Sequence, residues 1–372
     1  MTAYLEDRYE DCVNYFEKAL QIFRSSQQLI QNCRLTCKQE SDYANPLYPV
    51  DVEDLMFYDK TLRNTLCIVK CRQENVNDIY DDVQKFQDIF DKRIPYEYLN
   101  LCYFKVNSSQ KAASSAFTFL VANPDHELMR INLKRYSELP DVQINDIINY
   151  EAKEYIYLYF YGCAAYEKKD WNAVINYMEK SLFSYLQSED ECRSLCEGPF
   201  DAGFFFDFIP SISNHFTYVL KCKRNCQKKL ANLNGKIHED LLPSHYHYLQ
   251  YAYFKKGNFL AACEAVASYL LFVPDDETML NNMRYYIKQP KAQKEYFIPR
   301  KEAVRYIERD TYEKRIIQFI KKEFVFSKNA SDKSKVDSLS NDQQNEDIEL
   351  DDDSQQLVIQ KDNLPNKQKQ NI

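Results

Sequence analysis

Eight of the twelve cysteines in this 372-residue sequence fall into four pairs with the same spacing, C-x3-C. Residues four apart lie on one face of a helix, one turn from each other. Two antiparallel helices that each carry such a pair can be joined by two disulfides, the first cysteine of one helix bonding to the second of the other. The spacing predicts two helical hairpins with the bridges Cys33–Cys71, Cys37–Cys67, Cys192–Cys226 and Cys196–Cys222.

Each predicted bridge closes a loop of roughly 25 to 40 residues, which corresponds to about 3–4 kcal/mol as an upper figure. The second bridge of each pair adds less, because the first has already closed the loop. The spacing gives no pairing for the four remaining cysteines, Cys12, Cys102, Cys163 and Cys263.

Three other interpretations of the C-x3-C pairs stay open. They are free buried thiols, a four-cysteine zinc site, and the twin C-x3-C pattern of small proteins of the mitochondrial intermembrane space. In those small proteins the two pairs lie much closer together than they do in this sequence. Repetition of the spacing in four places favours disulfides, which form in the oxidising secretory pathway.

Composition excludes several classes of protein. Only 5 of the 372 residues are Gly, which argues against glycine-rich phosphate loops and against most folds rich in tight β-turns. The net charge of −8 gives no reason to expect nucleic acid as a partner. A membrane-spanning helix needs an apolar run of about 18 residues or more. No run in this sequence approaches that length, so no membrane-spanning helix is predicted.

The first residues, "MTAYLEDRYEDC", contain no apolar stretch of the kind found in a signal peptide. This disagrees with the secretory compartment that the cysteines indicate. We therefore expect an N-terminus that is incomplete or processed.

The sequence contains an internal duplication. Residues 96–136 align without a gap to residues 246–286, so that Tyr98 matches Tyr248 and Pro124 matches Pro274. The C-x3-C pairs recur in the same order in both halves. Each half is therefore predicted to contain a helix pair, a stapled helical hairpin and another helix pair.

The helix pairs resemble tetratricopeptide repeats. Aromatic helices, small residues such as Ala261 and Ala262, and a turn at Gly257-Asn258 are typical of helices that stack into one continuous core. We predict an all-α fold of two tetratricopeptide-like halves, residues 1–145 and 146–295. A C-terminal helix (296–326) and a disordered acidic tail (327–372) follow.

These features together resemble the leprecan family of collagen prolyl 3-hydroxylases and their non-catalytic relatives. The matching stretches are the four C-x3-C pairs, "YHYLQYAYFKKGNF", "SYLLFVPDDETMLNNMRYY" and "PRKEAVRYIERDTYEK". The resemblance covers about residues 4–326. It implies the lumen of the endoplasmic reticulum or secretion, unfolded procollagen chains as client, and a complex with a prolyl 3-hydroxylase and cyclophilin B.

Catalytic members of that family add a dioxygenase domain, whose iron needs two His and one carboxylate. His238 and Asp240 have part of this spacing, but the third ligand would be His245 or His247, which lie too close for the strands of a jelly roll. We therefore predict no catalytic, cofactor-binding or metal-binding residues, and a helper that is not an enzyme. The alternatives are the N-terminal part of a prolyl 3-hydroxylase and a structural extracellular or nuclear relative.

Two sequons predict N-glycosylation if the chain enters the lumen. Asn107, in "NSS", lies in an expected turn between two repeat helices, where the backbone should be exposed. Asn329, in "NAS", lies in the expected tail.

Overall fold

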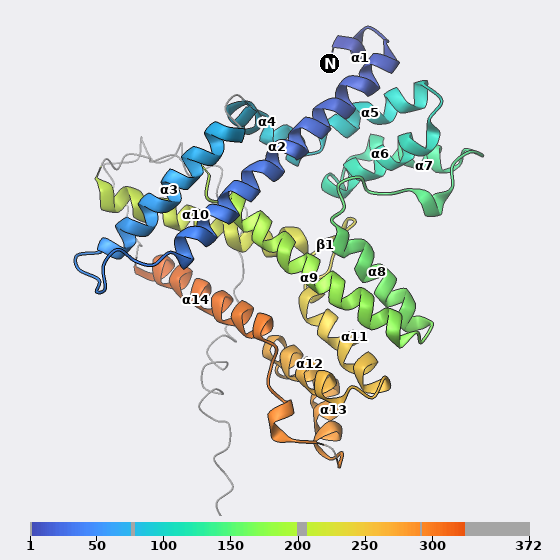
Figure 1. Cartoon of the computed structure of the whole chain (residues 1–372). Coiled ribbons are helices and arrows are strands. Elements are labelled where there is room, and N and C mark those ends of the chain that lie inside the picture. Colours follow the sequence, from blue (N-terminus) through green and yellow to red (C-terminus); the bar gives the residue numbers. More distant parts are fainter. Residues whose placement is uncertain (1, 76–78, 199–206, 291, 324–372) are drawn as a thin grey trace, which may run out of the picture. The chain divides into compact units, whose positions relative to one another are not determined.

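A computed structural model describes residues 2–75, 79–198, 207–290 and 292–323 (Figure 1). The first half forms α1 (Thr2–Leu5), α2 (Tyr9–Tyr43), α3 (Leu55–Asn75), α4 (Ile79–Asp91), α5 (Ile94–Lys105), α6 (Ser109–Ala122), α7 (Glu127–Ser137) and the 3-10 helix η1 (Ile144–Asp146). The second half forms α8 (Glu154–Glu167), α9 (Trp171–Leu195), α10 (Phe208–Leu230), α11 (Leu241–Lys255), α12 (Phe259–Phe272), α13 (Glu277–Ile287), the 3-10 helix η2 (Lys294–Tyr296) and α14 (Lys301–Glu323).

Three helix pairs, α5/α6, α8/α9 and α11/α12, share one kind of connecting turn. In each turn a residue with positive φ precedes the N-cap of the second helix, and these residues are Asn107, Lys169 and Gly257. Asp170 and Asn258 then cap α9 and α12, because each side chain accepts a hydrogen bond from the backbone N–H of the third residue of its helix. The repeated turn brings the helices of each pair back against each other.

Small residues allow the paired helices to approach closely. Ala112, Ala113 and Ala116 are fully buried on α6. Gly162 on α8 meets Met178 on α9 so closely that an added Cβ would lie 2.7 Å from the Met178 methyl carbon. Substitution there would displace a core side chain.

The duplication is visible in individual hydrogen bonds. The Tyr136 hydroxyl donates to Asn100 Oδ1 at 3.0 Å, and Tyr286, 150 positions later, donates to Gln250 Oε1 at 2.7 Å. All of these side chains are buried. The contact between α5 and α7 in the first half therefore recurs between α11 and α13 in the second.

Each half has its own core. In the first half, Leu99, Phe119 and Met129 pack around the alanines of α6. In the second, a larger cluster around Met178 and Leu249 joins α8, α9 and α11, and it includes Ala303 and Tyr306 of α14.

The predicted fold class is confirmed: the described residues are almost wholly helical, tetratricopeptide-like, and contain two disulfide-stapled hairpins. The sequence analysis missed one short antiparallel ladder, β1 (Asn232–Leu233) with β2 (Lys236–Ile237). Its turn is Asn234-Gly235, both with positive φ, as a type I′ hairpin turn requires. No helix among the described residues is long and apolar enough to cross a bilayer.

Residues 1–315 form one compact unit, and a second unit begins at Ile316. The C-terminal helix was expected at 296–326, and α14 spans Lys301–Glu323. The boundary between the halves stays a prediction, and the expected tail (327–372) lies outside the described residues.

Candidate functional site

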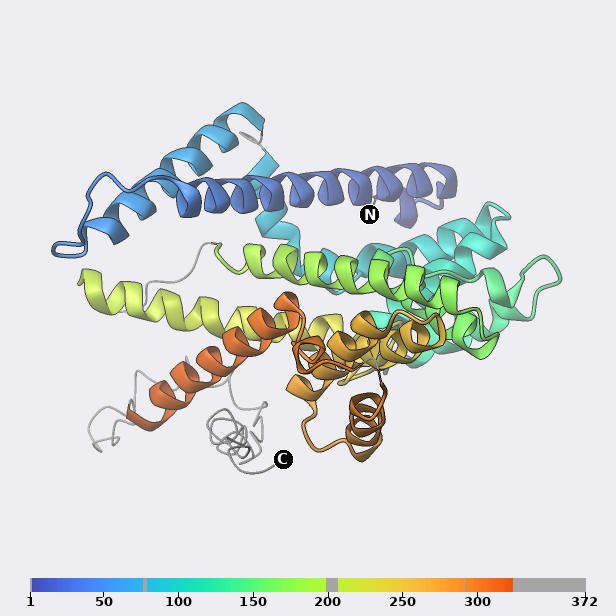
Figure 2. The same cartoon turned by 60° about the horizontal axis from the view of Figure 1, so that its bottom comes forward.

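The first stapled hairpin consists of α2 and α3. Cys33 and Cys37 are buried one turn apart on α2, and they bond to Cys71 and Cys67 of α3, with Cα–Cα distances of 6.0 and 5.5 Å. α3 runs back along the C-terminal part of the long helix α2 (Figure 2). None of its side chains between residues 55 and 73 is buried.

The second stapled hairpin consists of α9 and α10. Cys192 bonds to Cys226 and Cys196 to Cys222, with Cα–Cα distances of 5.9 and 5.7 Å. In contrast to α3, α10 also buries Val219 and Leu230. The second hairpin is thus held by packing as well as by its bridges.

Polar side chains connect the two hairpins at the C-terminal end of α9. Arg34 of α2 donates from Nη1 to the backbone carbonyls of Ser194 and Leu195, both at 3.0 Å. These carbonyls lie in the last turn of α9, where the helix dipole favours a cation. Next to them, Glu197 accepts from Lys223 of α10 at 2.5 Å.

Opposing effects act on the carboxyl group of Glu197. Burial alone would raise its pKa, but the hydrogen bond and charge of Lys223, followed by the charges of Lys38 and Arg34, hold the pKa below its usual range. Glu197 is therefore ionised at neutral pH and links α2, α9 and α10 electrostatically.

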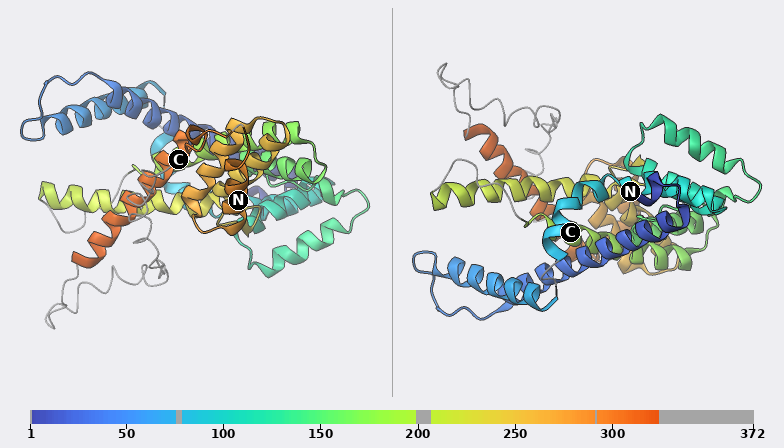
Figure 3. Two further views of the ribbon diagram at one scale, coloured as in Figure 1. Left: turned by 90° about the horizontal axis from the view of Figure 1, so that it is seen from below. Right: turned by 90° about the horizontal axis from the view of Figure 1, so that it is seen from above.

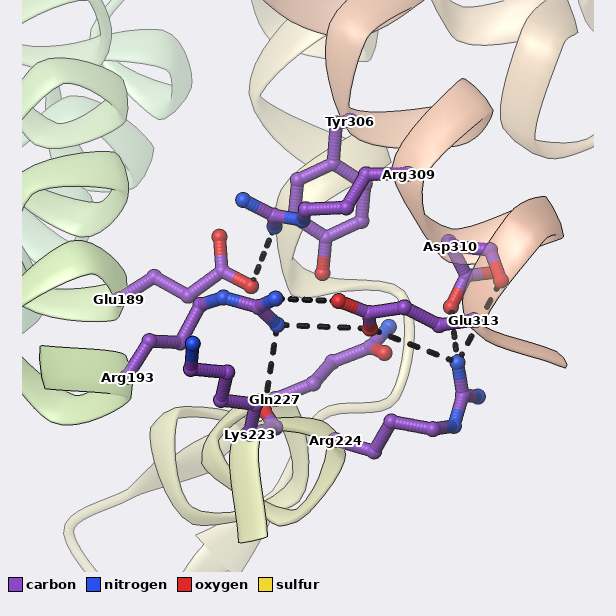
Figure 4. A pocket seen from close by; sticks show the side chains of 9 residues that line it. All are labelled: Glu189, Arg193, Lys223, Arg224, Gln227, Tyr306, Arg309, Asp310 and Glu313. Carbon is purple, nitrogen blue, oxygen red and sulfur yellow. Dashed lines mark hydrogen bonds and ion pairs between the residues drawn. The ribbon is translucent and has the colours of Figure 1, made fainter. Parts of the chain in front are cut away.

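A charged cluster lies between the second hairpin and α14 (Figure 4). Residues 301–315 of α14 belong to the same compact unit as α10, and Figure 3 shows both helices. Three ion pairs join the elements: Arg309 to Glu189 at 2.6 Å, Arg224 to Asp310 at 2.9 Å, and Arg193 to Glu313. Three guanidinium groups thus neutralise three carboxylates.

The staples place two of the three guanidinium groups of this cluster. Arg193 follows Cys192 directly, and Arg224 lies between Cys222 and Cys226. Bonding of the cysteines fixes the register of α9 against α10, and so it fixes where both guanidinium groups meet α14. Sequence analysis did not find this site, although the stretches "CRSLC" and "CKRNC" showed charges inside the cysteine units.

Glu189 is the most buried member of the cluster, with a side chain that is 3% exposed. Burial raises its pKa, and the charges of Arg309 and Arg193 act against that rise. Loss of one partner of such a buried pair typically costs about 3–5 kcal/mol, because the other charge stays buried. The cluster is therefore suited to holding α14 in one orientation.

The hollow lined by this cluster is about the size of one water molecule, too small for a substrate. Its lining contains neither His nor Cys. In the described part of the chain, no three His, Cys, Asp or Glu side chains converge as metal ligands would. The arrangement joins the second hairpin to α14 through ion pairs.

The four residues considered as metal ligands are not brought together as a ligand set. His238 and Asp240 lie between β2 and α11, whereas His245 is fully buried within α11. His245 Nδ1 lies 2.8 Å from the Leu241 carbonyl and therefore donates to it, and Nε2 lies 2.8 Å from Ser181 Oγ. His247 instead contacts the ring of Tyr269.

Burial explains the state of His245. It lowers the pKa of the imidazole to about 4, and the hydrogen bond to Leu241 acts against this shift. His245 is therefore neutral at pH 7. It is a core residue that joins α11 to α9.

One disulfide was not predicted. Cys12 of α2 bonds to Cys102 of α5, 90 positions away, and both residues are buried. Neither belongs to a C-x3-C unit, so the spacing gave no signal. Cys163 and Cys263 are free thiols.

Asn107 is exposed in the turn between α5 and α6, as the sequon analysis expected of its position. Its glycosylation stays a prediction. Asn329 lies outside the described residues.

Comparison with known proteins identifies the family. The family model described as the leprecan family TPR-like repeat region matches residues 1–290. The chain belongs to the leprecan family. This agrees with the resemblance carried by its cysteine pairs and repeats.

Similar proteins within the leprecan family differ in length. The chain is 33% identical to mouse prolyl 3-hydroxylase 1 over 338 residues, which cover 85% of this chain and 46% of that protein. It is 32% identical to human prolyl 3-hydroxylase 2, covering 76% of this chain and 42% of that protein. It thus spans about half the length of these two relatives. With mouse cartilage-associated protein it shares 31% identity, over 85% of this chain and 80% of that protein.

Proposed function

We propose that this leprecan chain is a non-enzymatic helper of the cartilage-associated-protein type, acting in a collagen prolyl 3-hydroxylation complex of the endoplasmic reticulum. Its partners in this proposal are a catalytic prolyl 3-hydroxylase, cyclophilin B and unfolded procollagen chains. The observation that carries the proposal is the match along four fifths of cartilage-associated protein, over this helical region.

The architecture supports a scaffold role. Stacked helix pairs offer extended surface to a peptide or a partner domain. The five disulfides hold this surface in a fixed arrangement and suit an oxidising compartment. Tethering a weakly held client to an enzyme raises the effective concentration of the client at that enzyme.

The identity of 33% with prolyl 3-hydroxylase 1 favours a second candidate, the N-terminal part of such an enzyme. Its chemistry would need Fe(II) and 2-oxoglutarate at a site formed by other residues. A structural extracellular or nuclear relative is the third candidate.

An activity assay and a pull-down test the helper proposal. The purified chain is supplied with Fe(II), 2-oxoglutarate and a proline-rich collagen peptide, and succinate is measured. Separately, the tagged chain is used in a pull-down from lumenal extract. A helper releases no succinate above background and recovers a prolyl 3-hydroxylase. Succinate release would show a catalytic site within this chain and would overturn the helper proposal. The second candidate, whose site lies on other residues, also predicts no succinate, and it is tested by looking for coding sequence of a dioxygenase domain downstream in the same transcript. Failure to recover any hydroxylase would favour the third candidate.

A further inference from the structure

Four aromatic side chains form a connected cluster where the α8/α9 pair meets α11. Tyr166 lies at the centre, with ring centroids 5.5 Å from Trp171, 5.1 Å from Tyr248 and 5.8 Å from Tyr251. Trp171 and Tyr251 also meet edge to face at 5.4 Å. Rings packed edge to face fix one another's orientation.

The cluster is anchored on one side and open on the other. Tyr166, Trp171 and Tyr248 pack against the second-half core, yet all four rings stay partly exposed. The turn at Lys169 and the Asp170 cap set the angle between α8 and α9, and so they place Tyr166 beside Trp171. The open side is therefore a rigid aromatic surface.

Several hydrogen-bond donors of this surface are unpaired in the described part of the chain. Within the described residues, the Trp171 indole N–H and the hydroxyls of Tyr166 and Tyr251 have no hydrogen-bond partner. The ammonium group of Lys255 lies 5.0 Å from the centre of the Tyr251 ring and adds a further donor. A ligand with exposed acceptors and few donors of its own would complement it.

The corresponding cluster of the next helix pair differs. There Phe254 and Phe259 pack on Tyr286, which is 3% exposed. The Tyr286 hydroxyl donates a hydrogen bond to Gln250. Phenylalanine rings have no polar tip. At the same repeat position, α11/α12 thus carries two partly exposed rings without a polar group, whereas α8/α9 carries two partly exposed rings that each have a donor.

We propose that Tyr166, Trp171, Tyr248 and Tyr251 form a docking surface for a proline-rich chain in the extended polyproline II conformation. Prolyl residues lack an N–H, so such a chain presents carbonyl acceptors and few donors, and its rings pack on aromatic faces. This inference rests on the proposed function, because it names the surface on which an unfolded procollagen client lies.

Trp171 is the only tryptophan of the chain, so its fluorescence reports directly on this surface. The full-length protein is titrated with a single-chain proline-rich collagen peptide, and with a Gly/Ser peptide of equal length as control. We expect a saturable change in Trp171 emission with the proline-rich peptide alone.

Two variants test the two interactions proposed for Tyr251, packing of its ring and hydrogen-bond donation by its hydroxyl. Tyr251→Ala removes a ring and is expected to weaken peptide binding about tenfold, the effect of losing one central aromatic contact. Tyr251→Phe keeps the ring but removes its donor, and is expected to weaken binding about threefold. The matched control is Phe183→Ala, an exposed aromatic elsewhere on α9. Circular dichroism checks that all variants are folded.

The outcomes separate this inference from the proposed function. If the wild-type protein and Tyr251→Ala bind the peptide equally, the surface lies elsewhere and the inference is overturned, while client binding stands. If the wild-type protein binds no proline-rich peptide, both the inference and the client-binding role are overturned. Recovery of a hydroxylase in the pull-down tests the helper role independently and should be unchanged in Tyr251→Ala.

Discussion

The two stapled hairpins share one cysteine pattern but have different surroundings. α3 of the first hairpin buries no side chain between residues 55 and 73, and it leaves Leu62, Leu66 and Val69 exposed along one face. α10 of the second buries Val219 and Leu230 and presents Arg224 to α14.

The difference shows that the same pair of disulfides has a different effect in each hairpin. In the first hairpin the bridges hold a helix that packing alone does not hold. In the second they set the register of a helix that is already packed, and they align its charges with α14. Removal of the bridges should therefore affect the two halves unequally.

The largest expected effect concerns the second staple. Replacing Cys192, Cys196, Cys222 and Cys226 by Ser is expected to lower the free energy of unfolding by about 4 kcal/mol, because the unfolded chain regains loop entropy and the register of α9 against α10 is lost. Urea unfolding followed by circular dichroism measures this change. A decrease of less than about 1 kcal/mol in the free energy of unfolding would contradict the difference proposed between the two hairpins.

The second prediction concerns pH. The position that His245 occupies in the second half is held by Pro95 in the first, 150 residues earlier. The folded-state pKa of His245 is about 4, below the unfolded value of about 6.5. Between pH 6.5 and pH 4 the unfolded chain binds a proton at His245 that the folded chain does not bind. The free energy of unfolding therefore falls by about 3 kcal/mol over this range as the pH is lowered, and it does not depend on His245 above pH 6.5.

His245→Gln should remove this part of the pH dependence of unfolding. His238→Gln is the matched control, since His238 lies outside the helices and is partly exposed. Unfolding free energies measured between pH 7 and pH 4 should give a flatter profile for His245→Gln alone. Equal slopes in the two variants would argue against a pH response confined to the second half.

A smaller effect is expected from the first staple. Replacing Cys33, Cys37, Cys67 and Cys71 by Ser should change the free energy of the main unfolding transition by less than about 1 kcal/mol. The reason is that α3 buries no side chain between residues 55 and 73 and can detach while the rest of the native fold stays intact. Hydrogen exchange should instead show loss of amide protection within α3. Retained protection would mean that packing, and not the bridges, holds this helix.

The smallest effect on stability concerns the turns. Asn107 and Gly257 occupy equivalent positions with positive φ, and only Asn107 lies in a sequon. Asn107→Gly should change the free energy of unfolding by less than about 0.5 kcal/mol, because both residue types tolerate this conformation. Produced in the secretory pathway, the wild-type protein should lose mass on glycosidase treatment, and Asn107→Gly should lose less. Asn329→Gln tests the second sequon in the same assay.

Local sequence patterns predicted much of this fold. The spacing of Cys33 and Cys37 indicated a helix face, and the gapless offset of 150 indicated the duplication. Both signals arise within a few helical turns, or from comparison of the sequence with itself. The turn at Asn234-Gly235 carried a hairpin signal of the same kind, and it was overlooked.

Contacts between distant segments could not be predicted in this way. Arg193 meets Glu313 across 120 positions, and Cys12 meets Cys102 across 90. A single charge or cysteine on a helix can pair with many others, and only the packing of intervening helices selects one. The aromatic surface around Trp171 could not be predicted either. The spacing of its aromatic residues along the helices is the same as that of residues in a buried core.

The bond between Cys12 and Cys102 has a topological consequence for the intact molecule. The bridges of the first hairpin lie inside the loop that it closes, so residues 12–102 form a covalent ring with two internal crosslinks. A protease that cuts a single peptide bond anywhere within this ring releases no fragment. In the second half, the outer bridge encloses only residues 192–226. A singly nicked first hairpin would therefore migrate as an intact chain until it is reduced, whereas most cuts in the second half would separate the chain at once.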